Sequence, residues 1–335
     1  MAFSLPDSFS AQVLAALEER GVSDPAQLAP SIKKLSDFYA TRPGEATPWN
    51  EPYAVPAYLA YFQPLNFVRL LSVWREVKRF LPESAIEQVW DFGSGLGVTQ
   101  WVLEHELSPR PLFAVETNAR AVELHKEWAS RTQARWQPQF TKNISPGANA
   151  LAVFSYSFLE IPEIDLSKFT HLLIVEPSTR EAGRDLMQAR AELMNEGFVA
   201  LAPCTHSDDC PLLVQSQRDW CHMRVHFDQP DWFAELEARL PMKNHTLTYS
   251  YLLMSRSVKD TKWRGAARVI GDTLPENGKT RQMICRGPQR EFVSWLHRYG
   301  EPPHIPHGAL VSGTENCETK GQELRAKPDT LKWDL

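Results

Sequence analysis

The chain has 335 residues, of which 43% are hydrophobic and 23% charged, and its formal net charge is −5. This composition is ordinary for a soluble globular protein, and no apolar run approaches the ~20 residues that cross a bilayer, so we expect no membrane partner. Residues 1–19 contain no Lys or Arg, which suits neither a secretory signal nor a transit peptide. With five cysteines, an odd count for a disulfide framework, these features predict a cytoplasmic protein with reduced thiols. The sequence leaves the oligomeric state open, and we expect a monomer.

Basic residues are concentrated in one window of the sequence. Between Arg256 and Arg290, nine basic residues against three acidic ones give a charge of +6, which leaves −11 for the rest of the chain. Such a patch on an acidic protein is an electrostatic footprint for nucleic acid, and a solvated face is the alternative. Trp263 is placed to stack on an unpaired base. The RNA-binding candidates are Arg256, Lys259, Lys262, Trp263, Arg264 and Arg268.

The apolar pattern predicts a helical region followed by alternating strands and helices. Helical spacing indicates short amphipathic helices up to about residue 40 and a longer helix over 58–80. Short apolar runs then alternate with helical stretches, which is typical of βαβ units and a parallel sheet covered by helices on both faces. The predicted strands are 88–92, 112–115, 151–156, 172–175 and 198–202, and the clearest crossover helix is 179–194.

The C-terminal third is predicted to be rich in β-structure. Strands are expected at 247–254, 267–270 and 281–285, then a helix near 291–299 and a flexible tail. The fold class is therefore α/β, a doubly wound sheet with an N-terminal helical cap and a C-terminal β-rich extension that contains the cysteines. The expected regions are a helical part (1–84), a cofactor-binding core (85–203), a cysteine motif and β-rich part completing the sheet (204–299), and the tail (300–335).

A glycine-rich loop joins the first predicted strand to a helix. Residues 89–97 read Val-Trp-Asp-Phe-Gly-Ser-Gly-Leu-Gly, and glycines there let the backbone approach a ligand beside free helix N–H groups. Glu116 ends the next strand, where a carboxylate accepts hydrogen bonds from ribose hydroxyls. This order resembles class I S-adenosylmethionine-dependent methyltransferases. The cofactor-binding candidates are Asp91, Gly93, Ser94, Gly95, Gly97 and Glu116.

Two alternatives stay open for this loop, a nicotinamide-binding domain and a ligand-free relic of the fold. Methyltransferases that act on base amines carry an Asn/Asp-Pro-Pro-aromatic motif after the fourth strand, where this chain reads Phe154-Ser155-Tyr156-Ser157-Phe158. No other residue is identified as the base or nucleophile of a methyl transfer, so no catalytic residue is predicted.

Four cysteines, Cys204, Cys210, Cys221 and Cys285, form the second candidate site. Their spacing differs from the paired Cys-x-x-Cys of a zinc ribbon, but four thiolates can hold zinc or an iron–sulfur cluster. The adjacent residues His206 and His222 are candidate substitute ligands or hydrogen-bond donors. Inert buried cysteines are one alternative. Another makes Cys204, which follows Pro203, a nucleophile like that of cytosine-C5 methyltransferases.

Several segments together resemble a known family. They are Asp91-Phe92-Gly93-Ser94-Gly95, Val175-Glu176-Pro177, Ala202-Pro203-Cys204-Thr205-His206, Asp219-Trp220-Cys221-His222, Tyr249-Ser250-Tyr251-Leu252 and Cys285-Arg286-Gly287. The chain is similar, from about residue 72 to 287, to the methyltransferase-like family of mitochondrial small-ribosomal-subunit assembly proteins and its bacterial relatives. Ser178 stands where that family leads us to expect glycine, and Cys317 has no assigned counterpart.

The resemblance implies a class I methyltransferase domain that binds S-adenosylmethionine, with Cys204, Cys210, Cys221 and Cys285 as ligands of a four-iron four-sulfur cluster. It also implies the small ribosomal subunit or its rRNA as partner. The leading hypothesis is a methyltransferase acting there in ribosome assembly or translation. A non-catalytic RNA-binding assembly factor of the same fold and a zinc-stabilised small-molecule methyltransferase are the alternatives.

Overall fold

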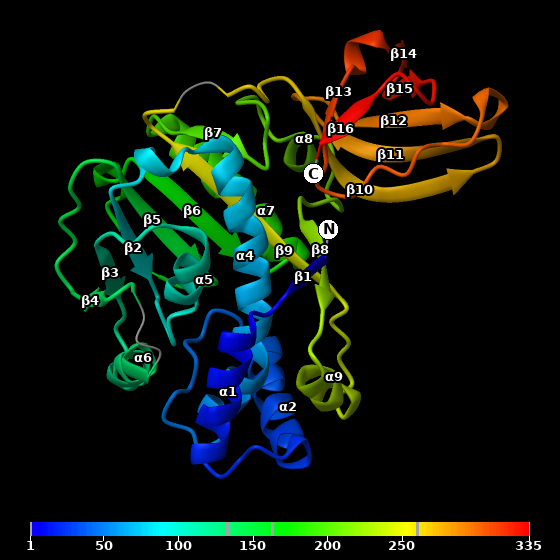
Figure 1. Ribbon diagram of the computed structural model, residues 1–335. Helices are drawn as coiled ribbons and strands as arrows, with labels where there is room; N and C mark the ends of the chain where they lie inside the picture. The colour runs from blue at the N-terminus through cyan, green and yellow to red at the C-terminus, as the bar shows by residue number, and fades with distance from the viewer. Residues whose placement is uncertain (1, 132–134, 162–163, 259–260, 335) are drawn as a thin grey trace. The chain divides into compact units, whose positions relative to one another are not determined.

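The computed structural model describes residues 2–131, 135–161, 164–258 and 261–334, and its strands form one sheet of nine strands and another of seven (Figure 1). The chain divides into two compact units. Unit 1 comprises residues 1–170 and 225–247, and unit 2 comprises 171–224 and 248–335. Within the described ranges, no helix combines the length and the apolar character that a membrane span requires.

Unit 1 begins with the predicted helical region. Asp24 caps the second helix by accepting a hydrogen bond from the Ala26 N–H at 2.8 Å, and Pro25 occupies the first helical position, where no N–H is needed. A π-helical turn, Tyr58–Phe62, leads into the long fourth helix. Such turns are rare and often mark functional sites. The helices are α1 (Asp7–Glu19), α2 (Pro25–Thr41), α3 (Ala54–Ala57) and α4 (Gln63–Phe80).

A parallel sheet follows in unit 1, with strand order β5-β2-β3-β4. From β2 the chain runs outward through β3 to β4 and then returns to the other side of β2 as β5. The order therefore reverses between β2 and β5, and open α/β sheets bind ligands in the crevice at such a point. The elements are β2 (Gln88–Phe92), α5 (Val98–Glu106), β3 (Leu112–Val115), α6 (Ala119–Arg131), β4 (Pro138–Phe140) and β5 (Ala150–Ser155).

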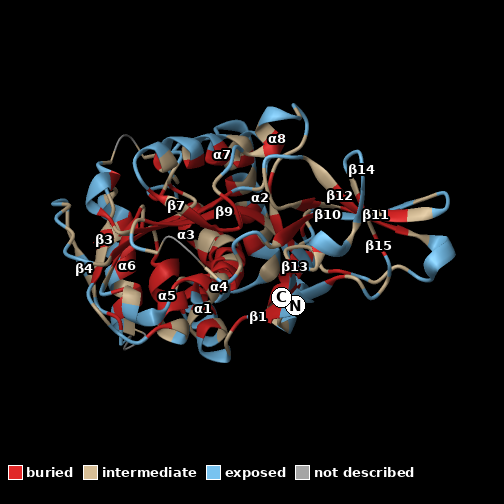
Figure 2. Ribbon diagram, turned by 90° about the horizontal axis from the view of Figure 1, so that it is seen from above, coloured by how far each residue is buried: buried red, intermediate tan, exposed pale blue. Residues whose placement is uncertain are grey.

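Strands β2 and β5 are buried along nearly their whole length. Figure 2 colours the buried residues of the molecule red. Continuous burial is typical of parallel strands covered on both faces, because neither face alternates with solvent. The predicted α/β class, with a parallel sheet whose strand order reverses, is confirmed. Unit 1 also holds a parallel pairing of β1 (Ala2–Ser4) with β8 (Met223–Asp228), and the helix α9 (Asp231–Ala238).

In unit 2, both β6 and β7 pair antiparallel with β9. The crossover helix α7 begins at a Thr179 cap, whose hydroxyl accepts from the Ala182 N–H at 3.2 Å. It ends at Gly197, whose φ of +94° needs glycine and lets the Phe198 N–H return to the Leu193 carbonyl at 3.1 Å. The elements are β6 (His171–Glu176), α7 (Arg180–Asn195), β7 (Val199–Ala202), α8 (Pro211–Val214) and β9 (Thr246–Ser255).

The seven-stranded sheet of unit 2 has the order β14-β15-β12-β11-β10-β13-β16. Buried and half-buried residues alternate strictly along β11, the period of a sheet with one covered face. The strands are β10 (Ala267–Glu276), β11 (Lys279–Cys285), β12 (Glu291–Leu296), β13 (Leu310–Ser312), β14 (Glu318–Lys320), β15 (Glu323–Ala326) and β16 (Lys332–Asp334).

This second sheet corrects three expectations. Strands β10 and β11 were expected to complete the first sheet and belong to the second. The helix expected near 291–299 is β12 followed by the 3₁₀ turn His297–Tyr299. Residues 300–335, expected to be a flexible tail, contain β13 to β16 and place Ile305, Val311, Leu324 and Leu331 in a buried core. The strands of 300–335 are only three or four residues long and lie between prolines and glycines. They are too short to give a periodic apolar pattern, which is why the sequence did not predict them.

We predict that Leu324→Ala lowers the free energy of unfolding by about 2–5 kcal/mol, because Leu324 is 1% exposed within the core of the second sheet. Urea denaturation followed by tryptophan fluorescence measures the change. Leu274→Ala is the matched control, since Leu274 lies on β10 of the same sheet and is 41% exposed. Equal stability of the two variants would contradict an ordered C-terminal sheet.

Candidate functional site

The glycine loop after β2 is tightly packed within unit 1. Gly93, Gly95 and Gly97 all have positive φ, between +50° and +79°, a region that side chains with a Cβ rarely enter. A Cβ on Gly93 would lie 2.6 Å from Cβ of Ser157, and one on Gly97 would lie 2.2 Å from Nε2 of His125. Both positions therefore need glycine for close approach as well as for backbone conformation.

Asp91 is buried at the end of β2 with half of its carboxylate unused. Its Oδ1 accepts a hydrogen bond from the Thr99 hydroxyl at 2.8 Å, whereas Oδ2 is buried without a hydrogen-bond partner among the described residues. Burial, together with the charge of Glu116, raises the pKa of Asp91 to about 7 against the lowering effect of the Thr99 hydrogen bond. A buried oxygen without a partner costs free energy, which a stable fold tolerates where a ligand supplies the missing donor.

Glu116 lies directly after β3 and ties two backbone segments together. Its Oε2 accepts from the Gly95 N–H at 3.0 Å, and its Oε1 accepts from the Asn118 N–H at 2.8 Å. A carboxylate can accept about four hydrogen bonds, so capacity for ligand hydroxyls remains. The loop and this carboxylate therefore form one hydrogen-bonded frame at the carboxyl ends of β2 and β3.

A buried polar network behind the loop was missed from the sequence. His125 is fully buried, with Nδ1 3.4 Å from the Ser94 hydroxyl and Nε2 2.9 Å from Oε1 of Gln100. Burial lowers the pKa of His125 to about 4, so the imidazole is neutral at physiological pH. Gln100 in turn donates to the Trp136 carbonyl at 2.9 Å. No spacing in the sequence links these residues, because they meet only through the packing of α5 against α6.

Aromatic residues of the N-terminal region also lie near the loop. Trp49 approaches Gly95, with Cζ2 3.7 Å from where a Cβ would stand, and its ring packs on Tyr58 at a centroid distance of 4.9 Å. Tyr58 lies on the π-helical turn, and burial raises its pKa to about 12. Tyr156 follows β5 with a φ of +61°, a strained conformation of the kind that gathers at functional sites.

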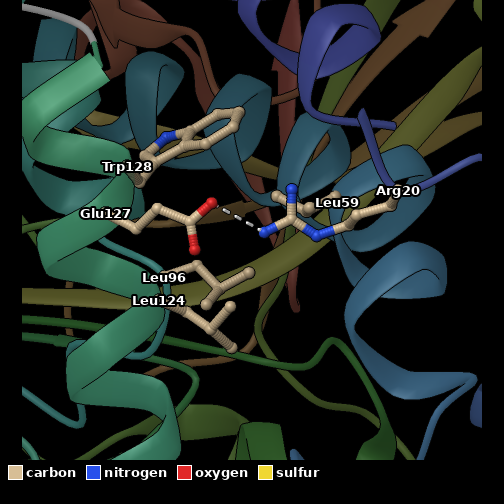
Figure 3. A pocket seen from close by; sticks show the side chains of 6 residues that line it. All are labelled: Arg20, Leu59, Leu96, Leu124, Glu127 and Trp128. Atoms are coloured by element: carbon tan, nitrogen blue, oxygen red, sulfur yellow. Dashed lines mark hydrogen bonds and ion pairs between the residues drawn. The ribbon is translucent and has the colours of Figure 1, made fainter. Parts of the chain in front are cut away.

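Figure 3 shows a different hollow of unit 1, closed on one side by the ion pair of Arg20 with Glu127 at 3.1 Å. Its volume is about 10 Å³, close to that of a single water molecule. None of the cofactor-binding candidates lines it, and we assign it no ligand. The lining residues are Arg20, Leu59, Leu96, Leu124, Glu127 and Trp128.

In unit 2 the four candidate cysteines lie close enough for the charges of their thiolate forms to interact. Cys204 and Cys221 are each 8% exposed, and Cys210 and Cys285 are half-buried. Burial raises the pKa of the Cys210, Cys221 and Cys285 thiols, and the neighbouring thiols raise it further. Among the described residues, however, no group of three or more His, Cys, Asp or Glu side chains has an arrangement that would hold a metal ion.

A guanidinium accompanies these thiols. Arg190 of α7 is 1% exposed and donates to the carbonyls of His206 at 2.8 Å and Asp208 at 3.1 Å. Its side chain also hydrogen-bonds Cys204 and lies within electrostatic range of Cys210 and Cys285. Within the described residues no carboxylate forms an ion pair with it, which is unusual because a buried charge is costly unless it is paired.

The two candidate histidines have different surroundings. His206 contacts the cysteine group, with Nε2 3.2 Å from Sγ of Cys285, and burial lowers its pKa to about 4. His222 packs instead against His307 at a centroid distance of 5.3 Å, and the His222 carbonyl lies 2.8 Å from Nε2 of His307.

A second arginine of α7 orders the loop between Cys210 and Cys221. Nη1 of Arg184 donates to the carbonyls of Leu212, Ser216 and Asp219, each at 3.0 Å. Ser178 stands where glycine was expected, and its hydroxyl is hydrogen-bonded to the Thr248 hydroxyl at 2.6 Å. The Ser178 carbonyl accepts a hydrogen bond from the Trp220 indole N–H at 2.8 Å. Helix α7 and the turn before it therefore hold the loop between Cys210 and Cys221. We call the whole segment from Cys204 to Cys221 the cysteine loop.

Four of the nine basic residues of the window are paired with acidic partners. The ion pairs are Lys279 with Glu276 and Glu323, Arg281 with Glu276, Arg286 with Glu291, and Arg290 with Asp219. Three of those four carboxylates, on Asp219, Glu291 and Glu323, lie outside the window. The local excess of charge in the sequence therefore overstates the positive surface.

The RNA-binding candidates have different surroundings. Arg268 is 1% exposed and donates to the carbonyls of Pro203 at 3.1 Å and Gly308 at 2.8 Å, so its expected role on a surface is wrong. Arg256 stacks on Phe198 at 4.0 Å. Lys259 lies outside the described residues.

The remaining candidates lie on one turn of unit 2. Lys262 and Arg264 are exposed, and the Lys262 ammonium lies 4.9 Å from the Trp263 ring centroid. This turn is attached to the cysteine segment, since the Gly265 N–H donates to the Thr205 carbonyl at 3.2 Å and Arg264 donates to the Ser207 hydroxyl at 2.8 Å.

Comparison with known proteins gives one family and several distant structures. The family model described as mitochondrial small ribosomal subunit Rsm22 matches residues 52–294. No curated protein matches the sequence. Similar solved structures include precorrin-6y C5,15-methyltransferase from Geobacter metallireducens (12% identity, TM-score 0.34, covering 56% of this chain and 87% of that one).

Two further structures hold S-adenosyl-homocysteine. They are TrmK from M. capricolum (10% identity, TM-score 0.33, 56% of this chain and 70% of that one) and magnesium protoporphyrin IX methyltransferase from Synechocystis (13%, 0.33, 56% and 83%). Similarity at this level supports no inference about substrate or activity.

We predict that Arg184→Ala loosens the loop between Cys210 and Cys221, because three carbonyls lose a charged donor worth about 1.5–3 kcal/mol per hydrogen bond. Limited proteolysis with mass spectrometry should detect new cleavage between residues 210 and 221. Arg180→Ala is the matched control, since Arg180 lies on the same helix with a side chain 51% exposed. Identical cleavage patterns for the two variants would contradict the anchoring role.

Proposed function

Because the chain belongs to the mitochondrial small ribosomal subunit Rsm22 family, we propose that it is an S-adenosylmethionine-binding, methyltransferase-like protein that acts on the small ribosomal subunit or its rRNA. The proposal includes a structural iron–sulfur cluster held by four cysteines, and a monomeric protein in the cytoplasm. The observation that carries it is the glycine loop at the point where the strand order reverses, framed by Asp91 and Glu116.

The loop residues fit the cofactor by their chemistry. Asp91 Oδ2 is a buried acceptor that no described residue satisfies, Glu116 has acceptor capacity left, and the glycines keep the backbone open to close approach. Asp91, Gly93, Ser94, Gly95, Gly97 and Glu116 would hold S-adenosylmethionine, which supplies an activated methyl group when bound. Glu116 would orient the ribose, and Asp91 would accept a hydrogen bond from a donor of the ligand.

The charge of Arg190 supports the cluster. With Cys204, Cys210, Cys221 and Cys285 protonated, this buried guanidinium would face no counter-charge, whereas four thiolates on a cluster would provide one. A single zinc ion requires four sulfur atoms at about 2.3 Å from one centre. A cubane binds each thiolate through a different iron, so its four sulfur ligands do not share one centre.

A second candidate function is a non-catalytic RNA-binding factor of the same fold. It is favoured by the segment after β5, which places a strained Tyr156 where amine-directed methyltransferases carry their motif. For either function, we propose that RNA contacts the turn with Lys262, Trp263 and Arg264, which lies near the cysteines. RNA binding that weakens as the salt concentration rises would support this surface.

We predict two effects of Asp91→Asn. The folded-state pKa of Asp91, about 7, lies above its unfolded value of 3.8, so the stability that the protonated carboxyl gives below pH 3.8 is lost as the pH rises through 7. The uncharged amide avoids this loss. Since one pKa unit corresponds to about 1.4 kcal/mol, urea denaturation at pH 8 should show a variant more stable than wild type by a few kcal/mol, with little difference at pH 4.5.

The same variant should bind S-adenosylmethionine at least about tenfold more weakly in isothermal titration, because an amide nitrogen cannot replace the carboxylate acceptor. Glu123→Gln, on the exposed face of α6, should change neither quantity. Unchanged affinity in a stabilised Asp91→Asn protein would remove Asp91 from the site. If titration of wild type with S-adenosylmethionine gave no binding heat, the result would favour the non-catalytic factor.

We predict about four iron and four sulfide atoms per chain in protein purified without oxygen. Cys210→Ser should lose most of both and bind purified small ribosomal subunits more weakly in co-sedimentation. Cys317→Ser is the matched control, since Cys317 packs against the second sheet and should leave metal content and binding intact. Stoichiometric zinc without sulfide would reject the cluster and reopen the small-molecule methyltransferase alternative.

A further inference from the structure

An open pocket lies at one edge of the seven-stranded sheet, entirely within unit 2 and outside residues 52–294 that the family model matches. Its volume of about 470 Å³ falls within the ~300–1,000 Å³ usual for ligand sites. It is built on β14 and β15 and on the turns beside them (Figure 1). The lining residues are Tyr299, Asn316, Glu318, Arg325, Ala326, Lys327, Asp329 and Thr330.

Two turns give the pocket fixed walls. The turn after β15 is closed by a backbone hydrogen bond from the Thr330 N–H to the Lys327 carbonyl at 3.0 Å, and by the Thr330 hydroxyl accepting from the Lys327 N–H at 3.1 Å. The turn after β12 approaches it closely, since a Cβ on Gly300 would lie 3.6 Å from Cγ of Pro328. The pocket is therefore formed by ordered backbone.

Tyr299 presents an aromatic surface in this pocket. At 47% exposure it is the most exposed aromatic side chain of the described residues, although its size favours burial. Arg298 holds it in place, with its guanidinium 4.8 Å from the ring centroid and Nη2 donating to the tyrosine hydroxyl at 2.9 Å. A fixed, exposed ring of this kind is a platform on which an unpaired base stacks.

The cations of the pocket differ from three basic residues of β11 and the turn after it. Lys279, Arg281 and Arg286 are held in ion pairs, whereas Arg325 and Lys327 form none within the described part of the chain. The buried Nε of Arg325 also has no hydrogen-bond partner there, although Glu318 lies opposite Arg325 in the strand register. Two cations beside an exposed ring suit a phosphate and its base.

We propose that this pocket binds one unpaired nucleotide of single-stranded RNA. The base stacks on Tyr299, and the phosphate contacts Arg325 and Lys327. The carboxylates of Glu318 and Asp329 accept hydrogen bonds from the base edge, which favours bases with an exocyclic amine over uracil, whose carbonyl oxygens these carboxylates would repel. The proposal rests on RNA as the partner in the proposed function and adds a site beyond the turn at Lys262.

The test uses the full chain, purified without oxygen, and fluorescein-labelled cytidine and uridine octaribonucleotides in fluorescence anisotropy. Wild type should bind the cytidine oligomer more tightly than the uridine oligomer and more tightly than free cytidine monophosphate. Tyr299→Ala should raise the Kd for the cytidine oligomer by about tenfold or more, and Tyr299→Phe, which keeps the stacking ring, should stay near wild type. Arg325→Gln should reduce the slope of log Kd against log salt by about one.

Trp333→Ala is the matched control, because Trp333 is an exposed aromatic residue of the same sheet but lies on the opposite edge strand, β16. It should leave the Kd unchanged. Equal Kd values for wild type, Tyr299→Ala and Arg325→Gln would overturn the pocket, as would the absence of saturable oligonucleotide binding. If small subunits still co-sediment in that case, the proposed function stands without this site.

The opposite result, oligonucleotide binding that depends on Tyr299 without subunit binding, would support the pocket and count against the ribosomal partner. Binding of a ribosomal-protein peptide in place of RNA, abolished by Tyr299→Ala, would overturn the nucleotide assignment. Thermal melts of each variant separate loss of binding from loss of fold, and Arg325→Gln keeps the test decisive if Tyr299→Ala is unstable.

Discussion

The organisation of unit 2 depends on two arginines of α7 that bind the carbonyl groups of the cysteine loop. Arg184 holds the carbonyls of Leu212, Ser216 and Asp219, and Arg190 holds those of His206 and Asp208. Irregular backbone contains carbonyls that no helix or sheet satisfies, and a guanidinium with five donors can satisfy several of them at once. The cysteines are positioned by this backbone, because their own thiols make few bonds that would order a loop.

Both candidate sites leave a buried charge incompletely paired. Among the described residues, one carboxylate oxygen of Asp91 has no hydrogen-bond partner and the Arg190 guanidinium has no carboxylate partner. Each arrangement costs stability in the protein alone, because a low-dielectric interior penalises uncompensated charge. Packing does not explain why each site keeps an incompletely paired buried charge. A bound group of complementary charge would explain it. For Asp91 that group carries hydrogen-bond donors, and for Arg190 it carries negative charge.

Charge in the sequence and charge on the surface differ in this protein. The +6 window from Arg256 to Arg290 loses half of its excess to Asp219, Glu291 and Glu323, which lie outside it, and Arg268 is buried as a donor to backbone carbonyls. By contrast Arg325 and Lys327, in a segment with no local excess of positive charge, form no ion pair within the described residues and lie beside an exposed aromatic ring. Antiparallel pairing brings distant residues opposite one another, so a charge count along the chain cannot identify a nucleic-acid surface.

The sequence by itself determined the α/β class, the glycine loop and six strands of the first sheet, β2, β3, β5, β6, β7 and β9, whereas β1, β4 and β8 were missed. Continuous apolar runs such as 88–92 and 112–115, separated by helical spacing, are local signals, and β2 and β3 begin and end where those runs do. Tertiary structure alone decided that residues 300–335 form strands, that His125 lies behind Gly97, and that Arg184 and Arg190 order the cysteine loop. These features depend on contacts between residues far apart in the chain, and the hydrogen-bonding and packing that create them leave no periodic pattern in the sequence.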